Sequence, residues 1–429
     1  MKKLFLLAML AAMFQFSQAQ DFAKVKTAVL LPGQLETAKT EIDKLMNDPK
    51  AQAKPEGWIL KAKVYSGIYA DEKLRAKYPG SEAIANSSFE KYAQMDPSFK
   101  TLKDDGLQTF AGDMYATSFS QGVRTYNAKV WDSAAYYFKY SVKYSDIIFK
   151  NKWGRDTTMN FDTTSILYAG VAYEKANVKD TAAMYYGRLA EKKLSKIGGS
   201  DISDIYRWLV DYYYNQKKDD ANAVKYLSLG KAVYPDDLLW PDTELEMVRK
   251  KGNKDSLFAK YEEITKEIPN NNLFWYNYGV ELYNYAIDTT SGKRPANADE
   301  LVTKAKEKLN KSLELNPDYA QASLLLGQIT YNQAVDLKAT TKDIKGQKPE
   351  DIKKRADIRV AAAKKFDEAI PYFEKVDKIL GAPGNKLKMD AKTTLKDAYD
   401  LLITIYEQKN VKEKVDAYTL KFNNVDKDH

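Results

Sequence analysis

The sequence predicts an all-α protein, an α-solenoid of stacked antiparallel helix pairs. Most segments carry apolar residues at positions i, i+3, i+4 and i+7, which is the spacing of one helix face. Alternating β-branched runs, which would indicate strands, are few. The third observation is periodic: a small residue, a large residue four positions later and often a proline eight positions after that recur along the chain.

The N-terminus resembles an export signal. Lys2 and Lys3 precede a short apolar run, and Ser17-Gln18-Ala19 places small residues where a signal peptidase cuts. We therefore expect residues 1–19 to be a signal peptide, with no membrane span in the mature chain. Cysteine is absent, which excludes disulfides, thiolate metal sites and a cysteine-linked lipid. The expected location is the bacterial periplasm, as a soluble protein that is not a lipoprotein.

Residues 20–57 are expected to be N-terminal capping helices. The stretch "VKTAVLL" is separated from "LETAKTEIDKLM" by Pro32-Gly33, which is typical of two short helices joined by a turn. They would cover the apolar end of the first full repeat.

Residues 58–422 contain about eight copies of the periodic pattern. Four copies keep the small residue, the large residue and the proline, and four keep only the first two positions, the last of them weakly. The complete copies are Ala85, Phe89, Pro97; Ala223, Leu227, Pro235; Leu257, Tyr261, Pro269; and Ala305, Leu309, Pro317. The partial copies are Ala134, Phe138; Ala182, Tyr186; Ala369, Phe373; and Lys414, Tyr418. We expect proline to end the second helix of a pair and the large residue to fill the space between adjacent pairs.

Successive copies lie 49, 48, 41, 34, 48, 64 and 45 residues apart, so most intervals contain insertions. Residues 71–82, 151–164 and 288–299 are rich in turn formers. The longest insertion, from Lys338 to Lys365, is basic and has helical periodicity of its own. Residues 423–429 are expected to be a flexible tail.

These positions resemble the tetratricopeptide repeat. Trp275 with Gly279, Leu326 with Gly327, and Ala169 and Gly170 with Tyr173 match its helix A. Ala305, Leu309, Ser312 and Pro317 match its helix B. The resemblance implies a right-handed superhelix, although the regular repeat is 34 residues long and only one interval here has that length.

The resemblance also implies a binding surface, because helix A of such repeats lines a concave groove that holds polypeptides. The positions carried over to this chain are aromatic and amide side chains. They are Trp208, Tyr212, Asn215, Gln216, Tyr276, Tyr283, Asn284, Gln321, Gln328, Tyr331, Asn332, Tyr399 and Tyr406. A tyrosine stripe at helical spacing also serves inter-helix packing, so both roles remain open for each tyrosine.

The sequence contains few residue patterns that could support catalysis. His429 is the only histidine, which leaves no catalytic triad or histidine metal site, and no phosphate loop or dinucleotide fingerprint appears. We predict no catalytic residues, no metal, no cofactor and no enzyme activity. Lysine and glutamate are interspersed, without a basic stripe for nucleic acid.

The predicted function is therefore a periplasmic scaffold or adaptor that binds another protein or peptide of the cell envelope through the groove. One alternative is a glycan-binding component of an outer-membrane uptake system, although such proteins are normally anchored through a lipidated cysteine. A further alternative is an (α/α) toroidal hydrolase, which would need two convergent acids in a central cavity.

Overall fold

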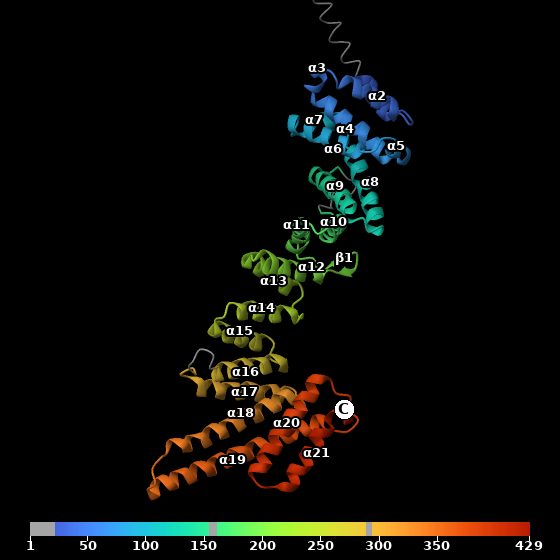
Figure 1. Cartoon of the computed structure of the whole chain (residues 1–429). Helices are drawn as coiled ribbons and strands as arrows, with labels where there is room; N and C mark the ends of the chain where they lie inside the picture. The colour runs from blue at the N-terminus through green and yellow to red at the C-terminus, as the bar shows by residue number, and fades with distance from the viewer. Residues whose placement is uncertain (1–21, 154–160, 289–293) are drawn as a thin grey trace, which may run out of the picture. The chain divides into compact units, whose positions relative to one another are not determined.

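A computed structural model describes residues 22–153, 161–288 and 294–429 of the chain (Figure 1). The expected signal peptide at residues 1–19 lies outside these residues, as do parts of the insertions at 151–164 and 288–299. The chain divides into two compact units, of which unit 1 ends at Asp237 and unit 2 runs from Leu238 to His429. Each unit is a row of antiparallel helix pairs, so the predicted all-α fold of stacked pairs is confirmed.

Unit 1 begins with a helix over residues 22–30, whose apolar side chains join the core of the helices that follow. Its further elements include one small β-hairpin and one π-helical turn, η1. They are α2 (Leu35–Leu45), α3 (Pro49–Gln52), α4 (Pro55–Ala70), α5 (Glu72–Lys77), α6 (Ser81–Met95), α7 (Lys100–Asp104), α8 (Thr109–Asn127), α9 (Trp131–Asn151), α10 (Thr163–Lys175), α11 (Lys179–Glu191), β1 (Lys196–Ile197), β2 (Ser200–Asp201), α12 (Ser203–Asp211), η1 (Tyr212–Lys217) and α13 (Asp220–Val233).

Unit 2 contains helices and no strand in its described residues, and it includes a short 3₁₀ turn, η2. Its elements are α14 (Leu239–Lys250), α15 (Lys254–Glu267), α16 (Asn272–Ile287), α17 (Ala298–Leu315), α18 (Ala320–Ala339), η2 (Thr340–Asp343), α19 (Pro349–Leu380), α20 (Met389–Gln408) and α21 (Lys412–Asp428). None of the helices within the described residues has the length and apolar character needed to cross a bilayer.

Each complete copy of the sequence pattern ends a helix as expected. In all four, the proline stands two residues after the last helical residue, because proline can neither donate the helical hydrogen bond nor fit behind the preceding turn. The helices that end in this way are α6, α13, α15 and α17, followed by Pro97, Pro235, Pro269 and Pro317.

The helices of a pair pack through a glycine on the first helix and a large side chain on the second. A Cβ at Gly170 of α10 would lie 2.5 Å from the ring of Tyr186 on α11, and one at Gly327 of α18 would lie 2.5 Å from the ring of Phe373 on α19. Two more pairs use the same contact, between Gly122 and Phe138 and between Gly279 and Leu309. The large residue therefore packs within its own pair. It also reaches the next pair, as expected: Phe138 stacks on Tyr168 of α10 at 5.2 Å, and Tyr186 meets Trp208 of α12 at 5.1 Å.

The chain end differs from its prediction. Residues 423–428 belong to α21 and are not a flexible tail. The side chain of Val425 is 1% exposed, and the backbone N–H of Gly384 donates to the carbonyl oxygen of Asp428 at 3.0 Å. Burial of Val425 against the rest of unit 2 offsets the entropy cost of ordering these residues.

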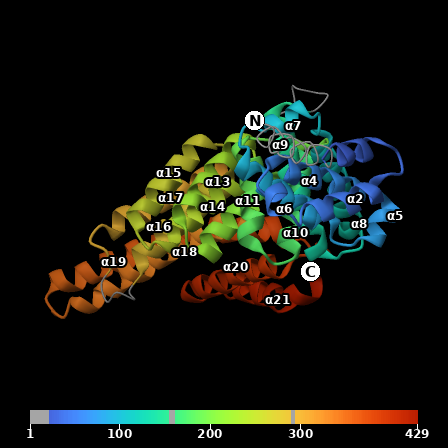
Figure 2. The same ribbon diagram turned by 90° about the horizontal axis from the view of Figure 1, so that it is seen from above.

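The basic insertion is also helical. The end of α18, η2 and the first part of α19 form a two-helix hairpin whose helices lie side by side in both views (Figures 1 and 2). At its tip, the guanidinium of Arg355 donates to the carbonyl oxygens of Ile344 and Gly346 at 2.8 and 2.7 Å. These bonds tie the connecting loop to α19.

Candidate functional site

Four of the predicted groove tyrosines lie in the core. Tyr212, Tyr283, Tyr399 and Tyr406 are 3%, 7%, 2% and 8% exposed, so they do not line an open groove. This corrects the assignment for these four residues. Their rings contribute apolar area to helix packing, and their hydroxyl groups find partners inside the protein, as buried tyrosines generally do.

The partner of three of these hydroxyl groups is a carboxylate on a neighbouring helix. The pairs are Tyr212 with Asp180, Tyr399 with Asp377, and Tyr406 with Glu374. The carboxylates raise the pKa of the phenols beyond the larger effect of burial, because both disfavour a phenolate. Each of these tyrosines is therefore held to a neighbouring helix through a carboxylate, a pairing that the sequence did not predict.

The other predicted aromatic residues are half-buried and contact other rings. Trp208 stacks on Tyr212 with ring centroids 5.0 Å apart and planes inclined by 11°. The two remaining contacts are edge-to-face. They join Tyr276 to Tyr319 at 5.0 Å and Tyr331 to Phe366 at 5.2 Å.

The predicted amides behave differently in the two units. In unit 1, Asn215 donates to Asp211 at 2.8 Å and Gln216 accepts from Lys179 at 2.9 Å, so both engage neighbours near η1. In unit 2, the Nδ2 of Asn332 donates to the Tyr283 hydroxyl at 2.8 Å, which brings α16 and α18 together.

Three further amides of unit 2 point to an available polar surface. Asn284 is exposed, and Gln321 and Gln328 are half-buried. Within the described residues, none of these three side chains has a hydrogen-bond partner. Together with Asn332 they form what we call the amide face, residues 284, 321, 328 and 332 on α16 and α18.

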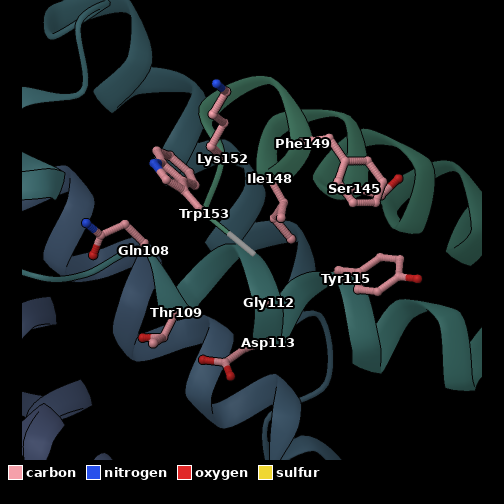
Figure 3. A pocket seen from close by; sticks show the side chains of 10 residues that line it. All are labelled: Gln108, Thr109, Gly112, Asp113, Tyr115, Ser145, Ile148, Phe149, Lys152 and Trp153. Atoms are coloured by element: carbon pink, nitrogen blue, oxygen red, sulfur yellow. The ribbon is translucent and has the colours of Figure 1, made fainter. Parts of the chain in front are cut away.

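A concavity lies in unit 1, between the first turns of α8 and the last turns of α9 (Figure 3). This pocket has a volume of about 800 Å³. The residues that line it are Gln108, Thr109, Gly112, Asp113, Tyr115, Ser145, Ile148, Phe149, Lys152 and Trp153. None of these residues is among the binding positions that the sequence predicted.

The end of α9 places Trp153 in the wall of the pocket. Lys152 has a left-handed backbone with φ of 57°, and the N–H of Trp153 returns to the carbonyl oxygen of Ile148 at 3.0 Å. With the Lys152 N–H bonded to the carbonyl of Phe149 at 3.2 Å, this is a Schellman closure. The indole ring then meets Phe99 edge-to-face at 5.7 Å, which fixes its position.

The floor of the pocket is a glycine. Gly112 is the fourth residue of α8, and a Cβ built there would have no heavy atom within 4 Å. The side chains of Trp153 and Tyr115 lie on opposite sides of Gly112, and Ile148 lies between them (Figure 3). The open backbone and the two aromatic rings therefore form one continuous, largely apolar surface.

Polar groups surround this surface. Asp113 is held by Lys63 at 2.7 Å, and the hydroxyl of Ser145 donates to the carbonyl of Val142 at 3.0 Å. Gln108, Thr109 and Lys152 have no side-chain partner within the described residues. These three side chains are available to a ligand at the rim.

One phenol of the pocket has a raised pKa. Burial, and secondly the charge of Asp162, raise the pKa of Tyr115 to about 12, so its phenol is protonated and can donate a hydrogen bond. In the residues that the structure describes, no three His, Cys, Asp or Glu side chains converge as metal ligands. The pocket can therefore bury an apolar group of a ligand and form hydrogen bonds with it at the rim.

No family model and no curated sequence matches the chain. Among solved structures, the chain is similar to the C-terminal part of a TPR repeat-containing protein from Cytophaga hutchinsonii, at 15% identity and a TM-score of 0.39, over 72% of this chain and 96% of that one. It is also similar to a TPR repeats protein from Bacteroides fragilis, at 16% identity and a TM-score of 0.26, over 67% of this chain and 98% of that one.

The chain's own contacts decide the repeat type. The glycine on the first helix, its large partner on the second and the proline after the second helix occupy the positions on which the resemblance was based. The helix pairs are tetratricopeptide-like. A tetratricopeptide-like row buries its apolar stripes between neighbours and leaves helix surfaces and hairpin ends open to other molecules.

Proposed function

We propose that the chain is a non-catalytic scaffold that binds a partner polypeptide, exported to the periplasm by the expected signal peptide. The observation that carries this proposal is the α8–α9 pocket with its open glycine floor. A volume of about 800 Å³ accommodates large apolar side chains of a partner, with room for the adjoining main chain. Such anchoring of aromatic or aliphatic side chains in pockets supplies much of the energy of protein interfaces.

Gly112 supports this reading because it has no structural partner. Glycine in a helix is less favourable than alanine by up to about 1 kcal/mol. At Gly170 and Gly327 the close approach of a ring explains that cost, but no such ring meets Gly112. Space kept open above a helix backbone is space that a ligand can occupy.

The rim groups suit a polypeptide. The side chains of Gln108 and Thr109 offer donors and acceptors to main-chain amides, and Lys152 offers a charge to a carboxylate. The amide face of unit 2 presents the same main-chain chemistry on helix A and is proposed as a second contact surface. Its members Asn284 and Gln328 retain the role predicted for them.

Selection of peptides from a random library tests the proposal. Peptides selected on the full chain should contain a large apolar residue, should lose binding to Gly112→Trp, whose indole fills the pocket, and should still bind Gly112→Ala. The alanine variant is the matched control because it adds one methyl group at the same position. Recovery of the same peptides with Gly112→Trp as with the original chain would refute pocket binding.

A glycan is the second candidate ligand, because the rings of Trp153 and Tyr115 flank the floor as aromatic rings flank sugars. Retention of an oligosaccharide on an array, abolished by Gly112→Trp and kept by Gly112→Ala, would favour the glycan over the polypeptide. Export has a separate test: a mature N-terminus at residue 20 in the periplasmic fraction would support it, and an intact residue 1 in the cytoplasm would refute it.

A further inference from the structure

The insertion between α18 and α19 concentrates positive charge. Residues 338–365, which we call the basic hairpin, contain ten lysine and arginine residues against four aspartate and glutamate residues. Their net charge of +6 compares with +8 for the whole chain, so the remaining 401 residues share only +2. The rest of the surface is nearly balanced, and the hairpin alone is strongly cationic.

These charges are not neutralised within the protein. One ion pair forms in the described hairpin, between Lys348 and Glu350 at 4.0 Å. Lys338 donates to an uncharged group, the side chain of Gln408, at 3.1 Å. Lys353, Lys354 and Lys364 are exposed on α19 and have no partner within the described residues. Unpaired like charges repel one another, so an anionic surface would be favourable for this hairpin.

Apolar side chains are exposed among the cations. Val360 is 70% exposed and Ile352 is 51% exposed. On a helix, Val360 shares the outward face with Lys353, seven residues before it, and Lys364, four residues after it. That face lies opposite the buried side chains of Ala362 and Phe366. The outward face of α19 is therefore cationic and apolar together.

The hairpin is also ordered and projecting. Arg355 ties the loop carbonyls of Ile344 and Gly346 to α19, as described above. In both views, α18 and α19 extend together beyond α20 and α21, which are the last two helices of unit 2 (Figures 1 and 2). A convex projection of this kind can lie on a flat surface without rearrangement of unit 2.

We propose that the basic hairpin binds the surface of a bilayer that contains anionic lipids. Lysine ammonium groups bind the lipid phosphates, and Val360 and Ile352 enter the boundary between headgroups and acyl chains. Single-stranded nucleic acid is the poorer fit because its binding sites stack bases on aromatic rings, and residues 338–365 contain no aromatic residue. The proposal is independent of the pocket and of its ligand.

Vesicle co-sedimentation of the full chain tests the proposal. Binding should be strong to vesicles of phosphatidylcholine mixed with phosphatidylglycerol, weak to vesicles of phosphatidylcholine alone, and reduced by salt. The variant Lys353→Gln/Lys354→Gln/Lys364→Gln should bind the anionic vesicles roughly 100-fold more weakly. Glutamine keeps the helix propensity of lysine, so the hairpin itself should persist.

Two further variants separate a lipid surface from other anionic partners. Lys266→Gln/Lys386→Gln/Lys427→Gln changes the same charge at exposed positions elsewhere in unit 2 and should bind vesicles as the original chain does. Ile352→Gln/Val360→Gln keeps every charge and should weaken vesicle binding at least several-fold while leaving weak binding to polyglutamate or DNA unchanged.

Several outcomes would each overturn the inference. They are equal binding to anionic and neutral vesicles, equal losses in the two lysine variants, and vesicle binding that is unchanged by Ile352→Gln/Val360→Gln. Tight binding to polyglutamate or DNA with no vesicle binding would also overturn it, in favour of an acidic protein or a nucleic acid.

Discussion

At the scale of single residues, the same substitution should have opposite effects at two glycines. Gly327→Ala places a methyl group 2.5 Å from the fully buried ring of Phe373, which cannot move aside. We expect a loss of about 1–3 kcal/mol in the free energy of unfolding. Gly112→Ala meets no atom and should gain about 0.4–1 kcal/mol from the reduced entropy of the unfolded chain. Urea denaturation of both variants, followed by circular dichroism, measures the two changes, and a change of the same sign at both positions would contradict the packing described here.

Some residue roles could be predicted from the sequence, and others could not. The glycine, large-residue and proline positions could be predicted because backbone approach and helix termination restrict the residue type strongly. The groove tyrosines could not, because one side chain offers the same ring to a ligand and to a neighbouring helix. The partner that decides the matter, such as Asp180 for Tyr212, is 32 residues away and on another helix.

At the scale of elements, α21 provides a test of the corrected chain end. Val425 is 1% exposed in the last turns of this helix, whereas Leu420 on the same helix is 65% exposed. Val425→Ala should lower the free energy of unfolding by about 2 kcal/mol because buried methyl groups are lost and a cavity is left. Leu420→Ala should change it by less than about 0.5 kcal/mol. Thermal or urea unfolding distinguishes them, and equal small effects would restore the flexible tail that the sequence predicted.

The pocket could not be predicted from the periodic pattern, because it is formed by the ends of two helices. Its walls combine the first turns of α8 with the last turns of α9, and a left-handed Lys152 sets the direction of Trp153. The periodic pattern predicted binding residues only at regular positions of helix A. A site made by the end of a hairpin lies outside that periodicity. The one sequence signal was Gly112, a helical glycine without a matching large residue on α9.

At the scale of the whole molecule, buried tyrosines with raised pKa values couple stability to alkaline pH. Burial raises the pKa of Tyr65, Tyr206 and Tyr261 to about 12, and Asp43 adds to the effect at Tyr65. In the unfolded chain these phenols ionise near pH 10. The folded state therefore binds more protons than the unfolded state between about pH 10 and 12.

The direction of the pH effect follows from these raised pKa values. The stabilisation is fully present below about pH 10 and is lost as the pH rises through about 12, because ionisation then favours the unfolded chain. We expect tyrosinate absorbance in the native chain to lag behind that of the urea-denatured chain and then to rise together with loss of helicity. Since the phenols lie in the cores of both units, this rise should be steeper than the titration of independent groups. Superimposable titration curves of the native and denatured chains would show that the tyrosines are solvent-exposed, contrary to their packing against neighbouring helices.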